Sequence, residues 1–296
     1  MLKYIAKSVL IWYYSLKGDD VMSRSEIYST YKNSILFYEH RTSYDVENTI
    51  IDAHTHESYE IILLKEGKIK YSVEGKNYKL KKNSIIFTRP HQIHSIKVGS
   101  NEYERYNIAA DFTKLPASFY DEIPADLDVI NCDGNRYLLS VFEQLDYYLN
   151  NGDRQNIDII VNNLIMEILY NMNIEAGQYH RQNFVSINPI IEAATLYIEQ
   201  NLTTVEGVEE ICNKLFITKS HLHHLFTKHL QTSPKQYITA KRLGLAQNKI
   251  RAGAKATDIY QGCGFNDYTT FFRNYVKHFG YSPSSEAERE VKLEIK

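Results

Sequence analysis

The sequence predicts an α+β protein with more than one domain, in which a region of short strands precedes a region made only of helices. Its 296 residues are enough for two domains that each bury a core. β-Branched and aromatic runs separated by turn residues fill about residues 34–113, whereas apolar residues recur at helical spacing from about residue 135 onward. Apolar content of 43% and charged content of 24% are typical of soluble globular chains, which argues against a disordered or a membrane protein.

Residues 1–24 are predicted to be an N-terminal extension. They contain a short apolar run from Val9 to Tyr14, which is too short to cross a bilayer and is not followed by a small-residue cleavage site. A secretory signal is therefore not indicated. Met22 opens a more polar start, which suggests that the preceding residues derive from an upstream start codon.

The cysteine content indicates the cellular compartment of the protein, and the distribution of charge indicates its partners. The chain has three cysteines, an odd number, and they lie far apart at Cys132, Cys212 and Cys263. A disulfide framework is therefore not expected, and a location in the reducing cytoplasm is expected. The net charge of −2 conceals an asymmetry between the two halves of the chain. Residues 203–283 carry 11 Lys and Arg against 5 Asp and Glu, whereas residues 1–183 carry 20 against 25. The C-terminal part is thus locally basic.

Residues 25–134 are predicted to form a small β-barrel or sandwich. Strand-like runs include "SYEIILLKEG", "KIKYSVEG", "NSIIFTRP" and "YERYNIAADF". Gly67, Gly75, Asn83 and Pro90 separate these runs as turn residues. Many short strands at such spacing are typical of sandwiches and small barrels.

Residues 135–183 are predicted to contain two amphipathic helices and a linker. The runs "RYLLSVFEQLDYYLNN" and "IDIIVNNLIMEILYNM" both place apolar residues at helical spacing, with a turn around residues 150–153. Such a pair cannot bury both of its faces alone. It is therefore interpreted as a connector, as a surface that pairs two chains, or as both. An ordinary pair that packs on a core is the alternative.

Residues 184–296 are predicted to be an all-α domain because they contain an internal repeat. "LFTKHLQTSP" and "NYVKHFGYSP" end at Pro234 and Pro283, which are 49 residues apart. Each is preceded by a helix, a tight turn and a second helix. The second helices start from a capping residue, Thr218 in the first unit and Asn266 or Asp267 in the second. Two apolar helices joined in this way form a helix-turn-helix.

This part of the chain resembles the AraC/XylS-type bacterial transcriptional regulators. The resemblance is carried by "LHHLFTKHLQTSPKQYI", by "GFNDYTTFFRNYVKHFGYSP", and by Arg242, Leu243, Ala246 and Ile250 between them. It implies two helix-turn-helix units joined by a long helix, and a sequence-specific regulator, not an enzyme. Double-stranded promoter DNA, a second copy of the chain and RNA polymerase are the partners it implies. Gln231 stands where a glycine is usual, so a positive φ is expected there.

The second helix of each helix-turn-helix is expected to enter the major groove and to read bases with the face that is not packed on the core. The resemblance places base contacts at Ser220, His223, His224, Tyr268, Thr269 and Arg273. An arginine suits guanine because its guanidinium can bond O6 and N7 together. Phosphate contacts, which fix register without reading sequence, are expected from Lys219, Lys228 and Lys277.

A cluster of histidines lies in the strand region. His54, His56 and Glu60 differ by even numbers, so on a regular strand their side chains would point to one face, into the barrel. The cluster resembles the first cupin motif, and Pro90 with His94 resembles the second. This implies a cupin-like sensor barrel in which His54, His56, Glu60 and His94 line the pocket of a small-molecule effector, for instance a sugar.

The same four side chains are candidates for iron, manganese or zinc, because neutral imidazoles and a carboxylate suit these metals. A cofactor is nevertheless not expected. Asn48 lies near the place where the motif requires a glycine, and "RPHQIHSI" is one residue shorter between proline and histidine than in metal-binding cupins. A metal site formed by His221, His223, His224 and His229 is disfavoured because their helix already has a role in DNA binding.

The sequence therefore favours a cytoplasmic DNA-binding transcriptional regulator whose barrel senses a small molecule. One alternative is a metal-dependent cupin enzyme fused to a DNA-binding module. Another is a constitutive DNA-binding protein whose barrel is only a scaffold for dimerisation. Metal analysis separates the first alternative, and a ligand-induced change in DNA affinity separates the second.

Overall fold

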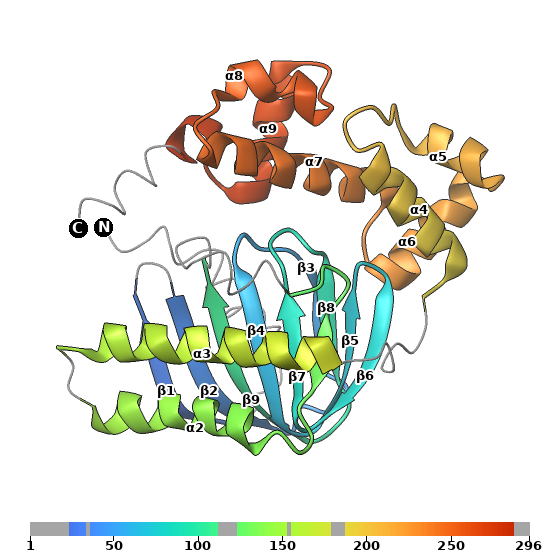
Figure 1. Ribbon diagram of the computed structural model, residues 1–296. Coiled ribbons are helices and arrows are strands. Elements are labelled where there is room, and N and C mark those ends of the chain that lie inside the picture. Colours follow the sequence, from blue (N-terminus) through green and yellow to red (C-terminus); the bar gives the residue numbers. More distant parts are fainter. Residues whose placement is uncertain (1–23, 34–35, 112–122, 153–154, 179–186, 287–296) are drawn as a thin grey trace. The chain divides into compact units, whose positions relative to one another are not determined.

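A computed structural model of the protein describes residues 24–33, 36–111, 123–152, 155–178 and 187–286 (Figure 1). The chain divides into two compact units, residues 1–186 and 187–296. Except for its last residue, the predicted N-terminal extension lies outside the described residues. Within the described part of the chain, no helix is both long enough and apolar enough to cross a membrane.

The first unit contains two antiparallel sheets, as the strand pattern predicts. Their hydrogen-bonded neighbours are all antiparallel. The larger sheet has the order β1 (Ser25–Lys32), β2 (Leu36–Tyr44), β9 (Glu102–Ala110), β4 (Tyr59–Glu66), β7 (Ser84–Thr88) and β10 (Val129–Asn131). The smaller sheet has the order β3 (Ile50–His54), β8 (His94–Val98), β5 (Lys68–Val73) and β6 (Lys76–Lys81).

The larger sheet buries both of its faces. In β4, Ile61 and Leu63 belong to one buried cluster, whereas Ile62 and Leu64 belong to another. This division follows from geometry, because successive side chains of a strand point to opposite faces. A strand that is buried on both faces requires a continuous apolar run, and the sequence "IILL" supplies one.

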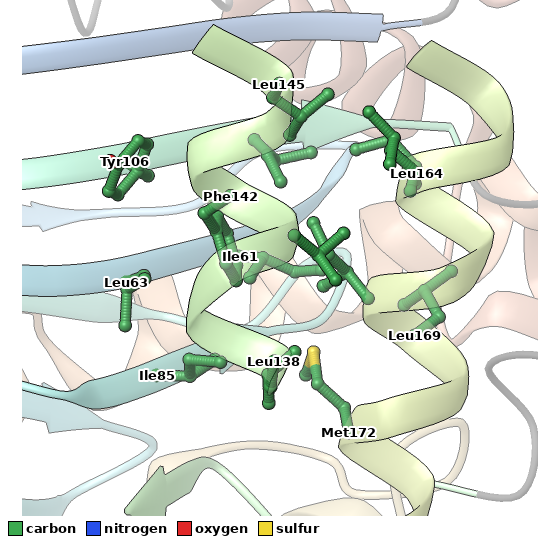
Figure 2. Close-up of a cluster of buried hydrophobic side chains, with 14 of the residues drawn as sticks. Ile61, Leu63, Ile85, Tyr106, Leu138, Phe142, Leu145, Leu164, Leu169 and Met172 are labelled. Carbon is green, nitrogen blue, oxygen red and sulfur yellow. The ribbon is translucent and has the colours of Figure 1, made fainter. Parts of the chain in front are cut away.

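Helices α2 (Arg136–Asn151) and α3 (Ile157–Gln178) cover one face of the larger sheet (Figure 1). Their apolar faces form a single buried cluster with side chains of that sheet. The structure therefore shows the core-packing role for this pair, and pairing of two chains through the outward helix faces stays a prediction. Figure 2 shows Leu138, Phe142, Leu145, Leu164, Leu169 and Met172 of the helices beside Ile61, Leu63, Ile85 and Tyr106 of the sheet.

A polar network also ties α2 to the strands. Asp146 of α2 accepts hydrogen bonds from Ser29 and from the hydroxyl of Tyr38 at 2.7 Å, and it lies 2.5 Å from Nδ1 of His40. Nε2 of His40 lies 2.9 Å from Glu104. Burial alone would raise the pKa of Asp146, but the hydrogen bonds from these side chains outweigh it and hold that pKa below its ordinary value.

The second unit is helical throughout its described elements and contains the two predicted helix-turn-helix units. The first is α5 with α6, the second is α8 and η3 with α9, and α7 joins them. The elements are α4 (Pro189–Gln200), α5 (Val208–Leu215), α6 (Lys219–Leu230), α7 (Pro234–Arg251), α8 (Ala256–Ile259), η3 (Gln261–Cys263) and α9 (Tyr268–Phe279).

Matching turns and caps explain why the repeat folds as two similar units. Each turn contains one left-handed residue, which is Phe216 with φ 55° in the first helix-turn-helix and Gly264 with φ 86° in the second. The side chain of Thr218 caps α6, as predicted, and Asp267 rather than Asn266 caps α9. The predicted positive φ of Gln231 is confirmed at 52°.

Arg242 of α7 contacts two separate parts of the second unit, the segment before α5 and the turn before α9. Its guanidinium donates hydrogen bonds to the carbonyls of Leu202 at 2.8 Å and Val205 at 2.5 Å, in the segment between α4 and α5. The same guanidinium lies against Gly264 in the second turn, where a Cβ atom would come within 2.5 Å of Nε. A side chain at position 264 would therefore be strained by the positive φ and would displace the guanidinium of Arg242.

We expect Asp146→Asn to lower the free energy of unfolding of the first unit by about 1–3 kcal/mol at neutral pH, because charge-assisted hydrogen bonds to a buried histidine are lost. Since the pKa of Asp146 is lowered in the folded state, its stabilisation is present above an unfolded-state pKa of about 3.9 and is lost as the pH falls through the folded-state pKa. Urea unfolding from pH 7 to pH 3 measures both effects.

Glu143→Gln is the matched control on the same helix. Its carboxylate forms an exposed ion pair with Lys65 at 2.6 Å, so a change below about 1 kcal/mol is expected. Equal losses in the two variants would contradict the role of Asp146. A difference between Asp146→Asn and wild type that persisted unchanged to pH 3 would contradict the assigned direction of its pKa.

Candidate functional site

The four predicted pocket residues come together in the first unit. His54 ends β3 and pairs across the smaller sheet with His94 of β8, while Glu60 lies on β4 of the larger sheet. The ligand atoms of the three histidines lie within 4.8 Å of one another. His56 lies in the connection between β3 and β4, so the expectation that one regular strand carries all three motif residues is wrong. A turn between two sheets brings them together instead.

The backbone fixes the orientation of each imidazole. Nδ1 lies within hydrogen-bond distance of a backbone carbonyl two residues away, at 2.8 Å for His54, 2.8 Å for His56 and 3.0 Å for His94. A carbonyl oxygen only accepts, so Nδ1 carries the proton in each ring. Nε2 is then left with a lone pair, as in histidines that bind metals.

Four further side-chain atoms of the cluster are buried and form no hydrogen bond with any group in the described part of the chain. They are Nε2 of the three histidines and Oε2 of Glu60, which lies 3.6 Å from Nε2 of both His56 and His94. A buried polar atom without a hydrogen bond costs about 1–3 kcal/mol. Four such atoms in one place are therefore available to bind an ion, a ligand or ordered water.

The charges of the cluster suit a cation. Burial, followed by the charge of His94, lowers the pKa of His54 to about 4, so this ring is neutral at pH 7. Burial by itself would raise the pKa of Glu60, but contacts with His56 and His94 outweigh it and hold the pKa well below its ordinary value. The carboxylate is therefore ionised at neutral pH.

These residues fit a divalent transition-metal ion. Three imidazoles with free Nε2 atoms and one ionised carboxylate are a donor set for zinc, manganese or iron. A bound ion would supply a Lewis-acid position for an oxygen atom of a ligand. The short spacing between Pro90 and His94, which argued against a metal from sequence, does not prevent His94 from joining the cluster.

Sequence reasoning missed two arginines in the interior of the same unit. Arg41 of β2 and Arg105 of β9 are both buried, and they stand directly opposite each other in the strand register. Strand alternation is the sequence signal that could have found Arg105. Arg105 is two residues from Tyr103, so it lies on the face of Tyr103 between the sheets. It is one residue from Tyr106, whose face packs towards the helices.

The second unit presents the predicted DNA-reading side chains of α6 to solvent. Ser220, His223 and His224 are exposed, on the side of α6 opposite its buried residues Leu222 and Phe226. The phosphate candidates on this helix, Lys219 and Lys228, are exposed too. Lys219 forms an ion pair with Glu209 at 2.8 Å, and such an exposed pair is weak enough to exchange for a phosphate.

Helix α9 follows the same plan with one difference. Thr269, Arg273 and Lys277 are exposed, while Phe271 and Tyr275 are buried in the core. Tyr268 is only half-exposed. Its ring lies 5.7 Å from that of Tyr260 and 5.8 Å from that of Phe271, so part of its surface is used for packing. The assignment of base contacts to these residues stays a prediction.

Both units match known protein families. Residues 37–128 match the AraC-like ligand binding domain, and residues 211–289 match a helix-turn-helix domain. The first match covers β3 to β9 and all but the first residue of β2, and the second begins within α5 and extends past the end of α9.

Individual relatives are transcription regulators. The chain is 30% identical to the lactose operon transcription activator of Staphylococcus xylosus over 43% of this chain and 46% of that protein. It is 21% identical to the transcriptional activator RhaS of Escherichia coli O81 over 78% of this chain and 85% of that protein. A solved structure of ToxT from Vibrio cholerae O395 is similar at 13% identity and a TM-score of 0.37, covering 90% of this chain and 97% of that one. The chain spans less than half the length of the first three curated relatives it matches.

We expect the full-length protein to bind about one Zn²⁺ or Mn²⁺ ion per chain at the His54, His56, Glu60 and His94 cluster, because the four buried donors converge. Titration calorimetry and metal analysis after dialysis measure the stoichiometry. His94→Gln should lose the ion, because it removes one of the converging Nε2 donors.

The control is His221→Gln in the second unit, which removes an exposed histidine of α6 and should keep the ion. A wild-type chain that retains no metal would contradict the fit. Loss of metal in His221→Gln instead of His94→Gln would move the metal site to the histidines of α6.

Proposed function

The chain is a member of the AraC-type transcriptional regulators, and from that premise we propose that it binds promoter DNA through α6 and α9 under the control of a small molecule in its first unit. The observation that carries this proposal is the pair of similarly capped helices in the second unit. Each packs an apolar face on a core and leaves a polar face with basic residues in solvent.

The two exposed faces suit two successive major-groove surfaces of one promoter. In a helix-turn-helix, the recognition helix reads base edges with residues near its N-terminus, while basic residues contact phosphates. We propose base contacts from Ser220, His223, His224, Tyr268, Thr269 and Arg273, and phosphate contacts from Lys219, Lys228 and Lys277. RNA polymerase is a further proposed partner.

The proposed effector site is the polar interior of the first unit, where His54, His56, Glu60 and His94 meet. A small molecule rich in oxygen, such as a sugar, would place an oxygen atom at the Lewis-acid position of an ion held by these four residues. The operon names of two relatives, lactose and raffinose, support a sugar-related ligand. Effector binding would act as a coupling free energy on DNA affinity.

We also propose that two chains pair through the outward faces of α2 and α3. Large apolar side chains remain exposed there although the inner faces are buried, and clustered exposed apolar residues are typical of association surfaces. These residues are Tyr137, Tyr147, Ile159, Tyr170 and Ile174. The free and buried cysteines fit a protein that acts in the reducing cytoplasm.

Arg273→Ala and Lys277→Ala form a matched pair on α9. Arg273→Ala should weaken operator binding by about 1–3 kcal/mol and relax the preference at one base pair, because a bidentate base contact is lost. Lys277→Ala should weaken binding to operator and to scrambled DNA alike and reduce the salt dependence, because a phosphate contact is lost. Fluorescence anisotropy with both DNAs at several salt concentrations measures these effects. Identical effects of the two variants on both DNAs would contradict the assigned roles.

The dimer proposal predicts that Ile159→Glu with Tyr170→Glu yields monomers. Both side chains are exposed on α3, so added charge should oppose pairing without disturbing the core. Light scattering during size-exclusion chromatography measures the mass, and Glu143→Gln on α2 is the control. A wild-type monomer, or a double variant that stays dimeric, would remove this surface from the proposal.

A further inference from the structure

The four side-chain atoms that meet in the histidine cluster are all hydrogen-bond acceptors. Nδ1 carries the proton in His54, His56 and His94, so each Nε2 has only a lone pair. The ionised carboxylate of Glu60 has no proton to donate either. Its Oε2 lies 3.6 Å from Nε2 of His56 and 3.6 Å from Nε2 of His94, beyond hydrogen-bond distance. Acceptors that face one another repel, so a positively charged group suits this cluster.

The spacing of these atoms selects a single ion. Two ligand atoms bound at about 2.1 Å to a tetrahedral metal ion are about 3.4 Å apart. This separation is close to the 3.6 Å between Glu60 and each of its two imidazole neighbours. The ligand atoms of the three imidazoles lie within 4.8 Å of one another, so small shifts of the rings would place them around the same ion. A water molecule has two protons and satisfies at most two of the four acceptors, whereas one ion satisfies all four.

An ion bound here would tie together parts of both sheets. His54 ends β3 and His94 begins β8 in the smaller sheet, whereas Glu60 is the second residue of β4 in the larger sheet. His56 lies in the connection from β3 to β4. The backbone N–H of His91, in the connection from β7 to β8, donates a hydrogen bond to the carbonyl of His56 at 2.9 Å. Two connections that cross between the sheets therefore meet at this cluster, and the ion would hold them in one arrangement.

The cluster also borders on solvent. Glu60 and His94 are buried, but His54 and His56 are only half-buried. Two of the four ligands therefore give an ion an entry path from outside the core. Occupancy of the cluster would then follow the concentration of the ion around the protein.

We propose that the divalent transition-metal ion bound by His54, His56, Glu60 and His94 is itself an effector of this protein, so that occupancy of the cluster alone changes the affinity for DNA. This inference rests on the proposed function, in that the first unit is taken to control DNA binding. Without a cation, repulsion among the acceptors favours separation of the two connections, whereas a bound ion favours their close arrangement. The ion thus interacts differently with the two arrangements, which is what a regulatory ligand requires.

The test measures DNA binding by the full chain at controlled ion concentrations and without any organic ligand. The chain is freed of metal with a chelator, and DNA that it binds is selected from a random pool with Zn²⁺ and without it. Fluorescence anisotropy then gives the affinity for the selected DNA. Zn²⁺ or, in a parallel titration, Mn²⁺ should change that affinity by about fivefold or more. Half of the change should occur at the ion concentration that half-saturates the chain in titration calorimetry.

Glu60→Gln and Glu47→Gln form a matched pair in the first unit. Glu60→Gln removes the carboxylate and supplies an amide N–H for the imidazoles, so it should fold, lose the ion and make DNA affinity insensitive to Zn²⁺ and Mn²⁺. Glu47→Gln makes the same change at an exposed position and should respond like the wild type. Circular dichroism checks that each variant folds. If Glu60→Gln does not fold, His56→Gln replaces it.

Three results would overturn the inference: binding of neither ion, an ion that binds but leaves DNA affinity unchanged, or an equal response to the ion in the wild type and in Glu60→Gln. The third result would place the effect outside this cluster. DNA binding that neither ion changes refutes this inference alone, because the proposed function then stands. Absence of binding to any selected DNA, with and without the ions, refutes the proposed function and with it this inference.

Discussion

The larger sheet must bury both of its faces, and the rest of the first unit depends on this constraint. A strand sends alternate side chains to opposite sides, so each strand of this sheet serves two cores at once. One core lies under α2 and α3, and the other lies between the two sheets. Without the helices, Ile61, Leu63 and Ile85 would face water, and their burial stabilises the fold by roughly 1.5–3 kcal/mol each.

The same alternation decides where polar groups are kept out of water. Glu60 and Arg105 have the inward phase, so they enter the space between the sheets, whereas His40 has the opposite phase and meets Asp146 under the helices. The network on the helix side is closed, because each ring nitrogen of His40 faces a carboxylate. The inner cluster differs, since His54, His56 and His94 each keep an Nε2 atom that no described group satisfies. Buried polar groups without partners destabilise a fold, so retaining them in one place is consistent with a binding site.

In the second unit, turn geometry and helix caps orient the two recognition helices. Both helix-turn-helix units use one left-handed residue in the turn and one side-chain cap at the start of the recognition helix. Arg242 donates hydrogen bonds to the segment before the first helix-turn-helix, and its guanidinium also lies against Gly264 in the turn of the second. One side chain of α7 therefore contacts both the segment between α4 and α5 and the turn that precedes α9. The exposed faces of α6 and α9 can then vary in sequence without affecting the buried packing that orients them.

Local features of the sequence by themselves determined the secondary structure and the helix-turn-helix repeat, because periodicity and capping act over a few residues. Helix α2 occupies the predicted residues 136–151, and Thr218 caps α6 as predicted. The cupin-like spacing also identified His54, Glu60 and His94 as neighbours, although a turn between sheets, not one strand, unites them. Only the tertiary structure decided that α2 and α3 pack on the sheet and that Arg41 stands beside Arg105. These contacts join residues tens of positions apart, and strand register, which no local pattern encodes, selects which of them meet.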